Sequence, residues 1–188
     1  RSLSLDNPFF QDGIAERVQL LFELADTYAG DMGQKPSALQ PLQQAVQLDP
    51  ANVDAIDRLL DLYEQLNRPA DHVKLLVVKA DALQDPLAKV DVLLQVAQLY
   101  QDKFRNVGEA IKMFQRVLDV DGANEIAVTT LKQIYEARKD WESFVNLGRR
   151  EIELTDDSQV RMERTLALAL LATEKIRKPD VCVVLWEQ

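Results

Sequence analysis

Residues 52–66 read NVDAIDRLLDLYEQL, and this stretch decides the fold class. Its apolar residues recur with the spacing of one face of an α-helix. The aspartates Asp54, Asp57 and Asp61 follow the same spacing on the opposite face. Asn52 is suited to cap the run, because its side chain can accept a hydrogen bond from a free amide of the first turn. The stretch therefore predicts one amphipathic helix.

The same pattern returns along the chain and ends each time in a tyrosine. These tyrosines are separated by 35, 37 and 35 residues: Tyr28, Tyr63, Tyr100 and Tyr135. A shift of 72 residues superimposes one pair of runs on the next and aligns identical residues: Asp49 with Asp121, Asn52 with Asn124 and Tyr63 with Tyr135. A fixed period of this size is the signature of a repeat architecture.

Each repeat contains two helical runs separated by turn-forming residues. We expect helix pairs at residues 14–29 with 37–48, 53–66 with 70–83, 87–102 with 108–120, 125–138 with 141–154, and 158–174 with the start of a partner at 180–188. Pro41 removes a backbone donor near the first turn of its helix, so that helix should begin late or with a kink.

These runs resemble the tetratricopeptide repeat family, whose units are antiparallel helix pairs of about 34 residues. The residues that carry the resemblance in the first unit are Leu21, Leu24, Ala25, Tyr28, Ala38, Leu42, Ala45 and Pro50, and in the third Leu93, Val96, Ala97, Tyr100, Ala110 and Phe114. Two positions depart from the family, which prefers a small residue where this chain has Leu60 and Lys132.

The resemblance implies an all-α fold, a right-handed α-solenoid of about four and a half antiparallel helix pairs. Residues 1–188 would form a single array with units at about 14–49, 50–85, 86–122 and 123–156, and an incomplete unit at 157–188. Tyr100 should then fill a central packing site.

Charge and composition exclude several classes of function. With 22 Lys and Arg against 31 Asp and Glu, the formal charge is −9, which disfavours nucleic acids and anionic membranes as partners. No apolar stretch is long enough to span a bilayer. The single cysteine, Cys182, and the single histidine, His72, fit a reducing, cytoplasmic setting, since one cysteine cannot form an internal disulfide and one histidine cannot build a histidine metal cluster.

No pattern in the sequence points to catalysis. His72 has no identifiable nucleophile or orienting partner, and phosphate loops, zinc spacings and nucleophile elbows are missing from the sequence. Trp141 and Trp186 are expected to pack between helices. We therefore expect no enzyme activity, no cofactor and no metal site.

In the family, the inner face of the first helices receives a partner's peptide or helix. By register, that face would include Phe22, Asp26, Asp54, Asp57, Asp61, Glu64, Asp91, Leu94, Gln98, Thr129, Gln133 and Glu136, with Leu166 and Leu170 toward the C-terminal end. This acidic lining predicts a partner with a basic or amphipathic segment and disfavours acidic chaperone tails. The alternative is that these carboxylates only solvate an exposed face.

The resemblance leads to a protein-interaction scaffold or adaptor as the expected function. Two alternatives remain open: a regulatory repeat domain of a larger enzyme, such as a signalling kinase, and a structural array that self-associates through its open repeat ends.

Overall fold

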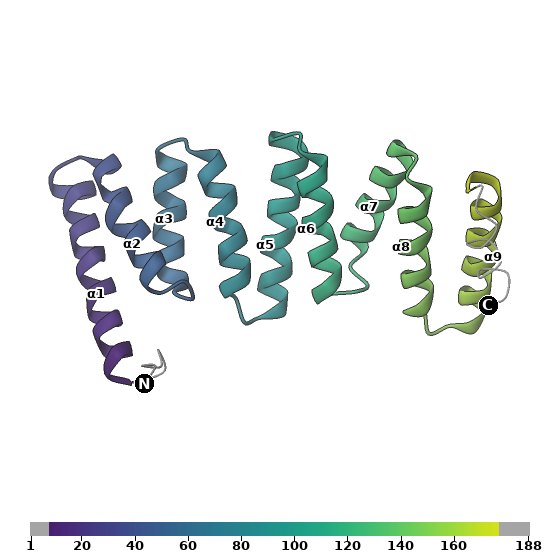
Figure 1. The fold of residues 1–188 in the computed structure, drawn as a ribbon, viewed down its shortest axis with the longest axis horizontal. Helices are drawn as coiled ribbons and strands as arrows, with labels where there is room; N and C mark the ends of the chain where they lie inside the picture. Colours follow the sequence, from purple (N-terminus) through teal and green to yellow (C-terminus); the bar gives the residue numbers. More distant parts are fainter. Residues whose placement is uncertain (1–7, 177–188) are drawn as a thin grey trace, which may run out of the picture. The chain divides into compact units, whose positions relative to one another are not determined.

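The computed structural model describes residues 8–176, and over that range the chain forms helices and no strand (Figure 1). The predicted all-α class, built from helix pairs, is confirmed. The chain divides into two compact units, Arg1–Val96 and Ala97–Gln188.

The first unit contains α1 to α4 and most of α5. Its helices are α1 (Pro8–Asp26), α2 (Leu39–Leu48), α3 (Val53–Gln65), α4 (Pro69–Ala82) and α5 (Pro86–Gln98), with a π-helical turn at Thr27–Asp31 and a 3-10 turn at Lys35–Ala38. Helices that follow one another in the chain pack together, α1 on α2, α2 on α3 and α3 on α4. Their apolar faces form a core that includes Ala25, Ala45, Ile56, Leu59 and Ala80.

The second unit begins with the end of α5. It continues with a π-helical turn at Leu99–Lys103, α6 (Val107–Val120), α7 (Glu125–Arg138), α8 (Trp141–Glu153) and α9 (Ser158–Lys175). Again α6 packs on α7, α7 on α8 and α8 on α9. The core between α8 and α9 consists of Val145, Ile152, Leu168, Ala169, Ala172 and Ile176.

The helix bounds agree closely with those predicted, except at the start of α1. This helix begins at Pro8, six residues before the predicted residue 14. Pro8 is compatible with a first helical turn, and Gly13 lowers helix propensity without interrupting the helix. The late start of the second helix is confirmed, because α2 begins at Leu39 after the 3-10 turn, with Pro41 buried in its first turn. The predicted helix at 180–188 lies outside the described residues.

The 72-residue shift is also visible in hydrogen bonds. The side chain of Asn52 accepts a bond of 3.0 Å from the Ala55 amide, and that of Asn124 accepts one of 3.1 Å from the Ala127 amide. A second matched pair links neighbouring helices: Gln43 Nε2 donates to Tyr63 Oη at 2.9 Å, and Gln115 Nε2 donates to Tyr135 Oη at 3.1 Å. The 72-residue repeat in the sequence is therefore matched by a repeat of hydrogen bonds in the structure.

The turn inside each of the four helix pairs that the structure describes in full contains one residue with a left-handed backbone. These residues are Gly33, Asn67, Arg105 and Lys139, with φ between 52° and 62°. In the first and third pairs the chain is one residue longer between the tyrosine and this position than in the second and fourth. The π-helical turns at Thr27–Asp31 and Leu99–Lys103, which are 72 residues apart, absorb that extra residue.

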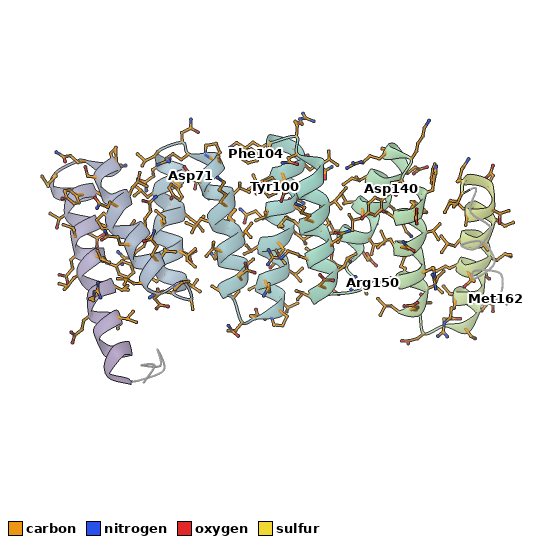
Figure 2. All side chains as sticks on the ribbon, viewed as in Figure 1. Asp71, Tyr100, Phe104, Asp140, Arg150 and Met162 are labelled. Carbon is orange, nitrogen blue, oxygen red and sulfur yellow. The ribbon has the colours of Figure 1, made fainter. Side chains whose placement is uncertain are left out.

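The π-helical turns change the environment of the tyrosines. Tyr63 and Tyr135, in regular α-helix, are buried, whereas Tyr28 and Tyr100 lie in the π-helical turns and are half-buried. The prediction that Tyr100 fills a central packing site is therefore wrong, because the wider turn displaces the side chain from the position that an α-helix would give it. Its ring lies 5.9 Å from that of Phe104, at the top of α5 (Figure 2).

Candidate partner-binding face

The candidate face of the first unit centres on α3. Asp54, Asp61 and Glu64 are exposed there, and Asp57 is half-exposed, because α3 buries its apolar stripe, including Ile56 and Leu59, toward α2 and α4. We call Asp54, Asp57, Asp61 and Glu64 the acidic face of α3. None of the Asp, Glu, Lys and Arg side chains whose burial the structure describes is fully buried, so these carboxylates remain at the surface.

Phe22 is not an open part of this face. It is 6% exposed, and the Arg58 guanidinium of α3 lies 4.4 Å from the centre of its ring. This contact is a cation–π arrangement, in which the positive group covers the negative face of the ring. The prediction that Phe22 lines an exposed groove is therefore corrected. The ring packs in the core of the first unit.

Arg58 also partly neutralises the negative charge of two carboxylates predicted to line the face, Asp26 and Asp54. Its Nη1 lies 3.3 Å from Asp26 of α1, and its Nε lies 3.3 Å from Asp54 one turn earlier in α3. Exposed pairs of this kind contribute little to stability, but they reduce the charge that a ligand would meet. Sequence reasoning missed Arg58, although it lies between Asp54 and Asp61 in the pattern.

Asp57 is compensated from the other side. Lys79 of α4 reaches it with Nζ at 2.6 Å from Oδ1. In contrast, Asp61 and Glu64 form no ion pair within residues 8–176. They are therefore the strongest remaining source of negative charge on the acidic face of α3.

A hollow of about 190 Å³ opens beside Asp61. The first helices α1 and α3 form its sides and α2 its floor, and it is lined by Ala25, Asp26, Ala29, Ala38, Leu42, Arg58, Asp61, Leu62 and Gln65. Apolar walls with a few charged groups at the rim are typical of surfaces that receive a side chain of a partner.

The remaining predicted residues belong to α5, α7 and α9. In the first unit Asp91 is exposed and Leu94 half-buried. In the second, Gln98, Thr129, Gln133, Glu136, Leu166 and Leu170 are exposed. Their exposure is compatible with a role in binding, and their participation stays a prediction.

The second unit contains a hollow that sequence reasoning did not identify. It measures about 210 Å³, lies between α7 and α9 with α8 as its floor, and is lined by Lys132, Phe144, Gly148, Glu151, Ile152, Arg164, Ala167, Leu168 and Leu171. One signal for this hollow was available in the sequence: Lys132 stands where the tetratricopeptide repeat family prefers a small residue. Arg164 and Glu151 belong to a run of mixed charges that is expected to be a solvated face, and no sequence signal indicated that they meet, because they lie on different helices.

Other candidate chemistries find no further support. His72 is half-buried near the start of α4. Within residues 8–176, no group of His, Cys, Asp and Glu side chains is arranged to hold a metal ion. Every helix in that range is too short or too polar to cross a lipid bilayer. Cys182 and Trp186 lie outside the described residues.

The repeated pairs, their shared caps and their matched glutamine–tyrosine bonds characterise the fold. Over the described residues the chain is an all-α array of helix pairs. Solved structures similar to this chain include the MamA protein, with 15% identity, a TM-score of 0.41 and coverage of 92% of this chain and 90% of that one. Another is a putative kinesin light chain with nearly identical TPR-like repeats from Podosopora anserina, with 18% identity, a TM-score of 0.39 and coverage of 91% and 92%. No protein-family model matches the sequence, and no curated protein does.

Proposed function

We propose that this chain is a non-catalytic protein-interaction scaffold that holds a partner polypeptide on the acidic face of α3. The observation that carries the proposal is the pair Asp61 and Glu64, which are exposed and without an ion pair in the described residues, together with the partly apolar hollow that Asp61 lines. A surface that combines uncompensated charge with an apolar recess can both attract and anchor a ligand.

The charge balance of this face supports a basic partner. The four carboxylates of the acidic face of α3 and the neighbouring Asp26 of α1 carry five negative charges, against one each on Arg58 and Lys79. A Lys or Arg side chain from a partner would be attracted to the uncompensated carboxylates. A carboxylate would meet like charge there, so acidic chaperone-tail peptides should not bind on this face.

The hollow beside Asp61 supports an amphipathic partner. Ala25, Ala29, Leu42 and Leu62 give it apolar walls, which suit one aliphatic or aromatic side chain. A segment with apolar residues on one side and basic residues on the other would therefore use both features of the face.

Binding of a defined probe tests the proposal. The probe is an amphipathic peptide of about 14 residues made of Leu and Lys, and its affinity for the chain is measured by titration calorimetry at low and high salt. We expect micromolar binding that weakens as salt rises, because screening reduces attraction between exposed charges. The variant Asp61→Lys with Glu64→Lys should weaken binding about tenfold or more.

A matched control separates local contact from overall charge. Glu16→Lys with Glu23→Lys changes the net charge by the same amount on the face of α1 opposite its buried residues Val18 and Ala25. The control should leave most of the affinity. If both double variants weaken binding equally, or if neither does, the acidic face of α3 is not the binding surface.

A further inference from the structure

The hollow of the second unit is built around three charged side chains. Glu151 of α8 forms an ion pair with Lys132 of α7, and its carboxylate lies 3.7 Å from Arg164 Nη1 of α9. The same Nη1 donates to Thr155 Oγ1 at 3.2 Å. Three successive helices therefore converge on one carboxylate.

The equivalent position in the first unit has the opposite charge. A shift of 72 residues places Lys79 at Glu151 and the buried Leu60 at Lys132. Lys79 supplies a cation to Asp57, whereas Glu151 supplies an anion to two cations. The charge pattern is thus specific to the second unit and is not a general property of the repeat.

One positive charge of this cluster is left over. Glu151 neutralises one of the two cations, and among the described residues the Nε and Nη2 groups of Arg164 make no hydrogen bond. Arg164 and Lys132 are partly exposed, at 49% and 32% of their side chains. The hollow therefore presents free N–H donors and a net positive charge in a chain whose formal charge is −9.

The walls of the hollow are apolar. Phe144, Ile152, Ala167, Leu168 and Leu171 surround the charged cluster. The volume of about 210 Å³ is smaller than the roughly 300–1,000 Å³ typical of small-molecule pockets. A site of this size suits one side chain of a peptide better than a whole metabolite.

We propose that this hollow is a second peptide-binding subsite, which takes a large apolar side chain and pairs the adjacent carboxylate of the same peptide with Arg164 and Lys132. The apolar side chain contacts the wall of α8 and α9. The carboxylate accepts hydrogen bonds from the unused N–H groups of Arg164, and such charge-assisted bonds belong to the stronger class. This subsite selects the opposite charge from the acidic face of α3.

Two peptides of about ten residues test the subsite by fluorescence anisotropy. One carries Leu-Asp in a background of Gly and Ser, and the other carries Leu-Asn in the same place. We expect the Leu-Asp peptide to bind about tenfold more tightly than the Leu-Asn peptide. Arg164→Gln should remove that preference and leave the Leu-Asn peptide unaffected.

Glu151→Gln should change the affinity for the Leu-Asp peptide in the opposite direction to Arg164→Gln. It leaves both cations unneutralised, so the Leu-Asp peptide should bind several-fold more tightly than to the unmodified chain. A purely structural role for the cluster would instead make this variant weaken binding.

Arg150→Gln is the matched control. Arg150 lies on the same helix as Glu151, pairs with Asp119 at 3.5 Å and donates to the Leu118 carbonyl at 2.6 Å, and it does not line the hollow. Its loss should not change either affinity. Equal binding of the two peptides, no binding of either at about 1 mM, or equal effects of Arg150→Gln and Arg164→Gln would each overturn the proposal. None of these results bears on the Leu-Lys probe and the acidic face of α3, so the two proposals fail separately.

Discussion

At the scale of single residues, Tyr135 shows how a polar hydroxyl is accommodated on a buried side chain of the repeat. Its ring is 5% exposed in α7, and its hydroxyl accepts a hydrogen bond from Gln115 of α6. Burial raises the pKa of Tyr135 and the nearby Asp140 adds to the effect, while the bond from Gln115 acts in the opposite direction. The neutral phenol is therefore the form that the folded unit prefers.

This preference predicts a loss of stability in alkali. A tyrosine with a raised pKa in the folded state contributes stability that is complete below the unfolded pKa of about 10 and is lost as pH rises through the folded value. Urea unfolding between about pH 8 and pH 11 should show a steeper fall for the unmodified chain than for Tyr135→Phe. Parallel profiles for the two proteins would contradict the prediction.

At the scale of elements, the packing of α8 on α9 depends on the absence of a side chain. A Cβ atom on Gly148 would lie 2.8 Å and 3.0 Å from the two Cδ atoms of Leu168, which is 7% exposed. The 72-residue shift places Leu76 at this position, and Leu76 is buried. Because Gly148 has no side chain, Leu168 of α9 can pack against α8 at this position. At the equivalent position of the first unit the helix carries the side chain of Leu76 instead.

Gly148→Ala should destabilise the second unit despite the better helix propensity of alanine. The overlap with Leu168 costs about 1–3 kcal/mol, which exceeds the gain of up to about 1 kcal/mol from propensity. The measurement is the free energy of unfolding in urea. In the background of Leu168→Ala the same change should become neutral or stabilising, because the obstructing atoms are gone. An equal cost in both backgrounds would show that the contact is not the cause.

The helices themselves could be predicted because their information is local. Asn52 and Asn124 cap their own first turns, and the apolar period of each run defines its buried side without reference to any neighbour. The π-helical turns at Thr27–Asp31 and Leu99–Lys103 were not predicted. The sequence shows one extra residue in these repeats, but a longer loop and a wider helical turn accommodate it equally well.

At the scale of the molecule, contacts run between helices that are neighbours in the chain. Within the units, α8 contacts α7 and α9, and α3 contacts α2 and α4. In such an array the stability of each part depends on its own interfaces, so damage remains local.

Hydrogen exchange with Gly148→Ala tests this locality. Amides of α8 and α9 should lose protection, because the substitution weakens the interface that these two helices share. Amides of α2 and α3 should keep the protection that they have in the unmodified chain. A uniform loss over both units would mean that the chain unfolds as one cooperative body.

The sequence by itself determined the helical class, the repeat and most helix bounds, because helical period, caps and turn residues act over a few neighbouring positions. It also placed acidic residues on α3. Only the tertiary structure decided which charges are compensated: Arg58 covers Phe22 and reaches Asp26, Lys79 reaches Asp57, and Arg164 joins Lys132 at Glu151. Long Arg and Lys side chains span the gap between helices, and a helical period specifies a face of one helix but not the charge that a neighbouring helix extends toward it.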